Sequence, residues 1–131
     1  MQTFLEFLKV RESAGLAFCR GRSDPVLALS TANEPASFFG PYGQIVLGAE
    51  KVRKSYANSE GAFGPRSESR IEIVHASESG EIAYWSGFQR ATVDMDGRLI
   101  PLELRVTELF RREDNAWKLV HRHADLIQPK K

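Results

Sequence analysis

Residues 82–127 read IAYWSGFQRATVDMDGRLIPLELRVTELFRREDNAWKLVHRHADLI, and this stretch decides the fold of the 131-residue chain. Aromatic and β-branched residues alternate there with polar ones at the period of two that is typical of β-strands. The dipeptide Asp96-Gly97 is a strong signal for a two-residue hairpin turn, and Asp114-Asn115 marks another turn. Upstream, an alternating segment that ends in Ser79-Gly80 adds one more strand. We therefore predict a four-stranded antiparallel meander, whose last three strands cover residues 82–92, 99–111 and 116–127.

The first half of the chain favours helices. Residues 3–22 carry a loose apolar stripe, and Asp24-Pro25 combines an N-cap residue with proline at the first helical position. This start predicts a short second helix ending near Asn33, and a third helical pattern runs from Gly48 to Gly61. A short hairpin fits the Pro- and Gly-rich residues between these two helices. We predict one α+β domain over residues 1–131, with the helices packed on one face of the sheet.

The charge balance and the cysteine count exclude several classes of protein. Lys and Arg total 18 and Asp and Glu total 17, and the resulting net charge of +1 argues against a nucleic-acid binder. The apolar runs are too short to span a bilayer, and the N-terminus shows no signal-peptide pattern. The lone Cys19 excludes an intramolecular disulfide and a multi-cysteine zinc site. We expect a cytoplasmic protein with no cofactor, no metal, and no nucleic-acid or membrane partner.

The predicted turns set a register for the sheet. Counting outward from Asp96-Gly97 places Arg90 opposite Glu103, an opposite-charge pair that supports this register. Counting from all three turns assigns one set of side chains to a first face of the sheet. Its rungs are Ile71, Phe88, Arg105 and Ala124; Ile73, Ser86, Thr107 and Arg122; and His75, Tyr84, Leu109 and Val120.

The second face is also rich in large apolar side chains. It carries Ala83, Trp85, Gly87, Gln89, Ile100, Leu102, Leu104, Val106, Phe110, Trp117, Leu119, His121 and His123. Neither face can be left wholly to water, and three helices are enough to cover only one of them. We therefore expect the other face to meet a second copy of the chain, in a homodimer built on the sheet.

The segment from Arg105 to Asp125, RVTELFRREDNAWKLVHRHAD, resembles the last hairpin of nuclear-transport-factor-2-like proteins. It is similar in particular to ketosteroid-isomerase-like and SnoaL-like members and to the association domain of calcium/calmodulin-dependent kinase II, which share a basic pair, a turn, Trp and a Val-His-x-His ending. The run Ile82-Ala-Tyr84 and the spacing of Phe38, Pro41, Gly48 and Tyr56 are similar to the same group. The resemblance implies a cone, in which a curved antiparallel sheet of the cystatin-like kind wraps around N-terminal helices and encloses a pocket.

The resemblance also implies which face lines that pocket. Pocket arginines of the kinase association domain match Ser86, Thr107 and Ala124, and a pocket aspartate of limonene-epoxide hydrolase matches Arg122. All four positions belong to the first face, so that face is expected to line the pocket and the second face to form the dimer. The resemblance does not imply any one of the activities known in this group for the present chain. The hydrolase needs aspartate where Arg122 stands, and the acid and base set of the steroid isomerase is missing at the matching positions.

Two arginines are the leading candidates for ligand binding. Arg105 and Arg122 lie on neighbouring strands, and two guanidiniums in an apolar cavity make a site for a carboxylate or another oxyanion. In the alternative reading, Arg122 reaches solvent and Arg105 is held by Glu103. The full set expected to bind the ligand is Tyr56, Tyr84, Ser86, Phe88, Arg105, Thr107 and Arg122.

His75 and Glu103 are the candidates for proton transfer. The alternatives are a core histidine and an ion pair of Glu103 with Arg90. His121 and His123 are read as a dimer-contact or solvated pair rather than as metal ligands. These residues predict a small-molecule pocket protein for an apolar ligand with an anionic or oxyanion group, acting as a cofactor-free isomerase, cyclase or hydratase/hydrolase. A non-catalytic ligand-binding or oligomerisation domain is the alternative.

Overall fold

The computed structural model describes residues 2–127 of the chain. Helices and strands follow in the order α1 (Phe4–Cys19), α2 (Asp24–Leu29), β1 (Ser37–Phe39), β2 (Ile45–Leu47), α3 (Ala49–Asn58), β3 (Glu68–Ser79), β4 (Ile82–Met95), β5 (Arg98–Glu113) and β6 (Ala116–Leu126). Thr3 begins α1, because its hydroxyl accepts the amide of Glu6 at 3.1 Å. No helix within residues 2–127 is long and apolar enough to cross a membrane.

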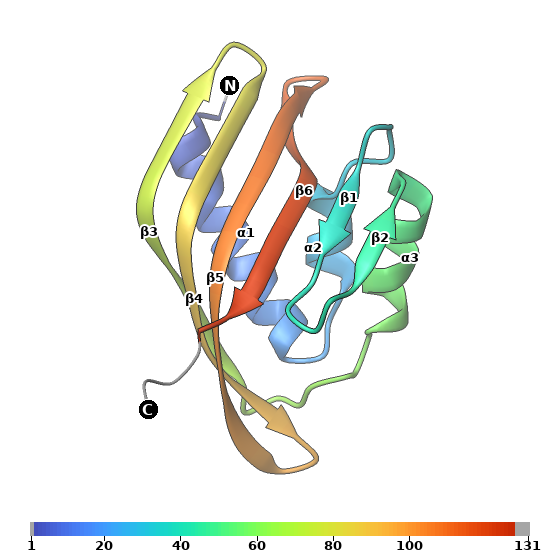
Figure 1. Cartoon of the computed structure of the whole chain (residues 1–131), viewed down its shortest axis with the longest axis vertical. Helices are drawn as coiled ribbons and strands as arrows, with labels where there is room; N and C mark the ends of the chain where they lie inside the picture. Colours follow the sequence, from blue (N-terminus) through green and yellow to red (C-terminus); the bar gives the residue numbers. More distant parts are fainter. Residues whose placement is uncertain (1, 128–131) are drawn as a thin grey trace.

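The strands form one curved, unclosed sheet in the order β2-β1-β6-β5-β4-β3 (Figure 1). All three helices lie on the same side of it, with α1 running across β3 and β4. This arrangement confirms the predicted α+β cone. The sheet is mixed rather than wholly antiparallel, because the hairpin β1–β2 joins the meander through parallel pairing of β1 with β6.

The central hairpin has the predicted register. Asp96 and Gly97 have φ angles of 55° and 87°, so both turn residues adopt the left-handed conformation that a tight hairpin requires. Met95 therefore faces Arg98, and Arg90 lies opposite Glu103. The turn residues alone were enough to align these two strands.

The two flanking registers were predicted wrongly, because each contains an irregularity. The first turn consists of Gly80 and Glu81 rather than Ser79 and Gly80, and β3 shifts register between Ile73 and His75. Strand β6 shifts beside Leu109, since Leu109 pairs with His121 whereas Phe110 pairs with Leu119. One extra residue in a strand moves all later side chains to the opposite face.

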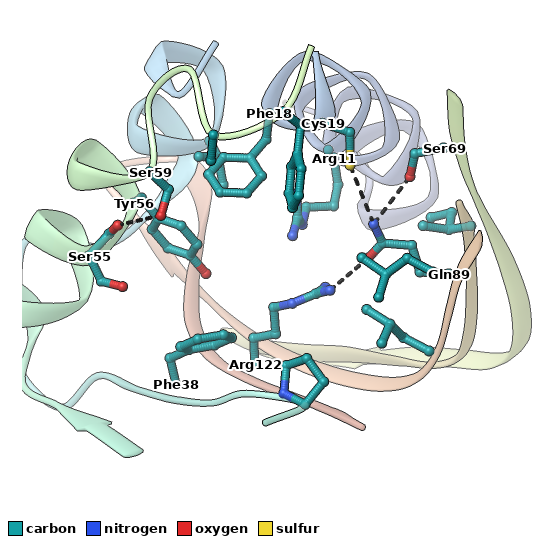
Figure 2. Close-up of a pocket in the computed structure, with 18 of the residues that line it drawn as sticks. Arg11, Phe18, Cys19, Phe38, Ser55, Tyr56, Ser59, Ser69, Gln89 and Arg122 are labelled. Carbon is teal, nitrogen blue, oxygen red and sulfur yellow. Dashed lines mark hydrogen bonds between the residues drawn. The ribbon is translucent and has the colours of Figure 1, made fainter. Parts of the chain in front are cut away.

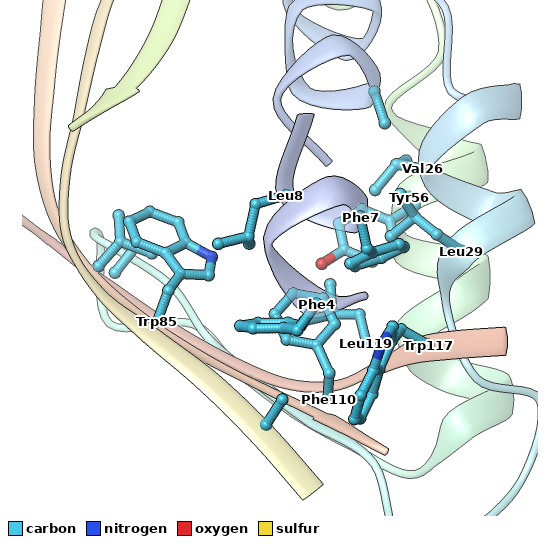
Figure 3. Close-up of a cluster of buried hydrophobic side chains, with 14 of the residues drawn as sticks. Phe4, Phe7, Leu8, Val26, Leu29, Tyr56, Trp85, Phe110, Trp117 and Leu119 are labelled. Atoms are coloured by element: carbon cyan, nitrogen blue, oxygen red, sulfur yellow. The ribbon is translucent and has the colours of Figure 1, made fainter. Parts of the chain in front are cut away.

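These shifts bring Ile71 and Arg122 to the face that the helices cover. Ile71 pairs with Gln89 instead of Phe88, and Arg122 pairs with Glu108 instead of Thr107. The helices cover the second face of β4 and β5, so the expectation that the first face lines the pocket is wrong. The hydrophobic core lies between this covered face and the helices (Figure 3), and its aromatic members are Phe4, Phe7, Tyr56, Trp85, Phe110 and Trp117.

Candidate functional site

A cavity of about 300 Å³ opens between the helices, the hairpin β1–β2 and the covered face of the sheet. Arg11, Trp85 and Leu104 are buried and form its closed end, whereas Tyr42 and Gln44 at its mouth are exposed. The walls are mostly apolar, with Phe18, Val26, Phe38, Val46, Ile71, Leu102 and Leu104 among the lining residues. A cavity of this size can take one small molecule.

A buried carboxylate supports the closed end. Glu108 is fully buried on β5, where it accepts the Nε and Nη2 groups of Arg11 at 2.9 and 2.8 Å. It also accepts Arg122 Nη1 at 2.7 Å and the indole N–H of Trp85 at 2.8 Å. These bonds tie together α1, β4, β5 and β6 and orient both guanidiniums at the cavity.

Gln89 binds the guanidinium of Arg122 through the nitrogen that Glu108 does not contact. Its Oε1 accepts Arg122 Nη2 at 2.6 Å, and its Nε2 donates to the hydroxyl of Ser69 at 3.1 Å. Figure 2 shows these contacts beside the cavity, with the guanidinium of Arg122 extending toward Gln89. Arg122 is therefore fixed in place before any ligand arrives.

The cluster carries a surplus positive charge. Burial acts to raise the pKa of Glu108, but the charges and hydrogen bonds of Arg11 and Arg122 outweigh it and lower this pKa to about 2. Glu108 is thus ionised at neutral pH, and one carboxylate faces two guanidiniums. A buried charge without a counterion is unfavourable, so the site favours an anion.

Tyr56 adds a hydrogen-bond donor. The residue is 8% exposed, and its hydroxyl has no hydrogen-bond partner among the described residues. Its ring packs against Phe18 and Phe38, with centroids 5.9 and 6.1 Å away. Burial raises the pKa of this hydroxyl, so it stays protonated and can donate to a ligand.

The other titratable groups of the cavity are less available. Burial raises the pKa of the Cys19 thiol, which keeps it in the unreactive protonated form. Glu12 is partly exposed, and its Oε2 accepts the backbone amide of Ile71 at 2.8 Å. No ion pair joins Glu12 to either arginine within the described residues.

Of the predicted ligand-binding residues, the structure places only Tyr56 and Arg122 in this cavity. The other five lie on the uncovered face of the sheet, because the helices cover the opposite side of β4. There Arg105 forms a bidentate ion pair with Asp125 at 2.6 and 2.7 Å. The remaining members of that group are Tyr84, Ser86, Phe88 and Thr107.

Both candidates for proton transfer also lie outside the cavity. His75 is exposed, and its Nδ1 contacts the Tyr84 hydroxyl at 3.0 Å. Glu103 accepts Arg90 Nη1 at 3.2 Å, which is the ion pair of the alternative reading. The expected position of these two residues in the pocket is therefore wrong.

The histidine pair of β6 lies on the uncovered face too. His121 contacts the Ser37 hydroxyl at 2.7 Å, and the ring of Phe39 packs edge-on against both His121 and His123. Among residues 2–127, no three His, Cys, Asp or Glu side chains lie close enough together to bind a metal ion.

Arg11 and Glu108 were missed from the sequence, although both carry a visible signal. Arg11 lies on the apolar stripe of α1, three residues after Leu8 and three before Ala14. Glu108 occupies an inward position between Val106 and Phe110. A charge at a core position needs a partner, and two such charges of opposite sign predict each other.

Sequence comparison matches residues 16–127 to the SnoaL-like domain. Comparison with curated proteins finds no significant match. Solved structures share the fold. A Streptomyces avermitilis protein, provisionally named a dehydratase of the nuclear-transport-factor-2-like family, superposes with a TM-score of 0.78 at 21% identity, over 96% of this chain and 97% of its own.

Two further structures extend the likeness. A Parabacteroides distasonis protein, provisionally named a ketosteroid isomerase, has a TM-score of 0.69 at 17% identity, over 95% of this chain and 87% of its own. A Xanthomonas campestris protein, provisionally named a calcium/calmodulin-dependent protein kinase II association domain, has a TM-score of 0.76 at 13% identity, over 99% of this chain and 91% of its own. At such identities the likeness shows the fold alone.

Proposed function

The chain belongs to the SnoaL-like domain family of the nuclear-transport-factor-2-like superfamily, and from this premise we propose that it binds a small apolar molecule through an anionic or oxyanion-like oxygen. The observation that carries the proposal is the buried cluster of Arg11, Arg122 and Glu108, which leaves one positive charge in excess at the closed end of an apolar cavity. The unpartnered hydroxyl of Tyr56 supports the same reading.

Thermal unfolding in the presence of small molecules tests this function. The panel contains aromatic and alicyclic acids, cyclic ketones, lactones and steroids. A ligand at a hundred times its Kd adds about 2.7 kcal/mol of stability, and each kcal/mol raises the Tm of a domain this size by roughly 3–5 °C. Stabilisation should be lost in Arg122→Gln and kept in the matched outer-face variant Arg105→Gln. A panel that leaves Tm unchanged would contradict the proposal.

A catalytic role of the isomerase, cyclase or hydratase kind is a second candidate, favoured by Tyr56. A buried donor beside a guanidinium stabilises the oxygen of an enolate as it forms. Glu108 is too weak a base at neutral pH, which leaves Glu12 as the cavity carboxylate to move a proton. The reaction would proceed by removal of a proton from the carbon next to a carbonyl group and its return to another carbon.

Deuterium exchange separates catalysis from binding. A bound cyclic ketone in heavy water should exchange the protons next to its carbonyl, as followed by NMR. Glu12→Gln should abolish this exchange while binding survives, and the outer-face variant Glu103→Gln should exchange at the wild-type rate. Binding without exchange in the wild type would leave the chain a non-catalytic ligand-binding domain.

We also propose that a second copy of the chain covers the outer face of the sheet. Ile82 and Leu109 are 52% and 38% exposed there, and farther along the same face Arg90 forms ion pairs with Glu72 and Glu103. A two-fold contact would cover these two side chains with the same face of a second copy. Light scattering should give the mass of a dimer for the wild type and of a monomer for Leu109→Glu. A monomeric wild type would contradict this arrangement.

A further inference from the structure

We infer that the ligand of this cavity is a monoanion, namely an apolar acid with a single carboxylate received jointly by Arg11, Arg122 and Tyr56. This inference rests on the proposed function and names the class of ligand within it. Three features of the site favour such a ligand: the net charge of the cluster, the N–H and O–H donors that its internal hydrogen bonds leave free, and the absence of a side chain at Gly15.

The buried cluster carries more positive than negative charge. Glu108 forms ion pairs of 2.8 Å with Arg11 and 2.7 Å with Arg122, so two cations share one carboxylate. Both guanidiniums are largely withdrawn from water, with 7% and 11% of their side chains exposed. Glu12, the other carboxylate of the cavity, forms an ion pair with neither. One negative charge on the ligand therefore neutralises the buried cluster of Arg11, Arg122 and Glu108.

The remaining donors point to a carboxylate. Arg11 gives Nε and Nη2 to Glu108, and its Nη1 makes no hydrogen bond to any described residue. Arg122 gives one hydrogen of Nη1 to Glu108 and one of Nη2 to Gln89, which leaves its Nε–H and the second hydrogen of each Nη. The Tyr56 hydroxyl has no partner within residues 2–127. Donors from three elements can therefore serve the two oxygens of one carboxylate.

Gly15 keeps the free nitrogen of Arg11 open. It lies inside α1, where glycine costs roughly 1 kcal/mol of helix stability relative to alanine. A Cβ atom built at this position lies 3.6 Å from Arg11 Nη1, and Gly15 lines the cavity. The missing side chain thus leaves room for a ligand atom beside that nitrogen.

The rest of the cavity disfavours other charge states. A neutral ligand would leave the surplus positive charge without a counterion. A second negative charge at the same end would find no further cation. Among the described residues, the charged side chains that line the cavity are Glu12 and the two arginines that already pair with Glu108. The apolar walls, which include Phe18, Phe38 and Leu102, suit a hydrocarbon tail.

Three probes with one skeleton test the inference. They are 3-phenylpropionate, its neutral amide 3-phenylpropionamide, and benzylmalonate, which adds a second carboxylate beside the first. Isothermal titration calorimetry of the wild type in mildly alkaline buffer should show the carboxylate binding about ten- to a hundredfold more tightly than the amide, because it alone offers charged acceptors. Benzylmalonate should bind at least about tenfold more weakly than 3-phenylpropionate.

Variants then assign the preference to the cluster. Arg122→Gln makes the cluster neutral and should bring the ratio of carboxylate to amide affinity close to one. Arg122→Lys keeps the charge and should keep the preference, as should the outer-face control Arg105→Gln. If Arg122→Gln fails to fold by circular dichroism, the ratio in the wild type and in Tyr56→Phe still decides, because Tyr56→Phe should weaken both probes while the carboxylate stays preferred.

The possible results distinguish the monoanionic ligand, the role of the arginine cluster and the proposed function from one another. An amide that binds as tightly as the carboxylate, or a tighter benzylmalonate, overturns the monoanion and leaves the binding pocket standing. A preference that survives in a folded Arg122→Gln overturns its assignment to this cluster. Failure of all three probes to bind overturns the proposed function together with the inference.

Discussion

The two faces of the sheet each carry a bidentate arginine–carboxylate pair, and the pairs differ in little except their surroundings. Arg11 and Glu108 meet at 2.9 and 2.8 Å on the covered face, and Arg105 and Asp125 meet at 2.6 and 2.7 Å on the outer face. The first pair has side chains 7% and 0% exposed, and the second 65% and 41%.

This difference decides what each pair can do. Water screens the outer pair, so it adds little to stability and leaves nothing for a ligand to complete. On the covered face, burial keeps the interaction strong, and Arg122 adds a second cation to the same carboxylate. The difference between the two pairs therefore lies in their environment rather than in their geometry.

The largest expected effect comes from removing the carboxylate of each pair. Glu108→Gln leaves two buried guanidiniums without a counterion, and should lower the free energy of unfolding by about 3–5 kcal/mol. Asp125→Asn removes the equivalent charge on the outer face and should change stability far less. Urea unfolding of both variants makes the comparison, and equal losses would show that burial does not separate the two faces.

Acid should separate the faces in the same way. The pKa of Glu108 is lowered from an ordinary 4.5 to about 2, so its ionised form stabilises the fold at higher pH and this stability is lost as the pH falls from 4.5 toward 2. The shift corresponds to about 3 kcal/mol. Urea midpoints measured across this range should fall steeply for the wild type and less steeply for Glu108→Gln. An equally steep fall of the urea midpoint in both proteins would show that protonation of Glu108 is not the cause.

A third variant tests the irregular pairing that sets one of these faces. Gly87 lies opposite the register shift of β3, where an added Cβ would come within 2.1 Å of the Glu72 carbonyl oxygen and 2.9 Å of the Val74 amide. Gly87→Ala must displace backbone, and should lower the free energy of unfolding by about 1–3 kcal/mol. Ser86→Ala on the adjacent outer position is the control, with a small effect expected in the same urea assay.

The register shifts in β3 and β6 explain which parts of the sheet could not be predicted from the sequence. Asp96-Gly97 set the central register correctly, because left-handed turn residues are readable as residue types. The extra residues Val74 and Val120 look like any other strand valine, so nothing in the pattern marks them. Each bulge moved part of one flanking strand by one position, so Arg122 and Ala124 were predicted on the same face as Ser86 and Thr107. The positions matched through the family resemblance then all pointed to that face, which the helices leave uncovered.

The sequence predicted the type of residue that lines the cavity, but not which residues they are. Two arginines in an apolar cavity were expected, and the structure supplies two, with Arg11 in the place assigned to Arg105. Arg11 and Glu108 both occupy core positions that the helical and strand periods reveal. That they face each other depends on how α1 packs against the sheet, which no local sequence pattern contains.

The smallest expected effect on stability belongs to Gly15, and its sign differs from all the others. Gly15→Ala places a methyl group 3.6 Å from Arg11 Nη1 without adding or removing a charge. The helix gains up to about 1 kcal/mol from the substitution, so Tm should rise. Binding of 3-phenylpropionate should weaken several-fold, because the methyl group occupies space beside the one Arg11 nitrogen that Glu108 leaves free. The matched change on the exposed side of the same helix, Ser13→Ala, should alter neither binding nor the carboxylate preference. A variant that gains stability and binds as tightly as the wild type would show that Nη1 takes no part in the site. The covered face would then bind through Arg122 and Tyr56 alone, and the Arg11–Glu108 pair would be as purely structural as its counterpart on the outer face.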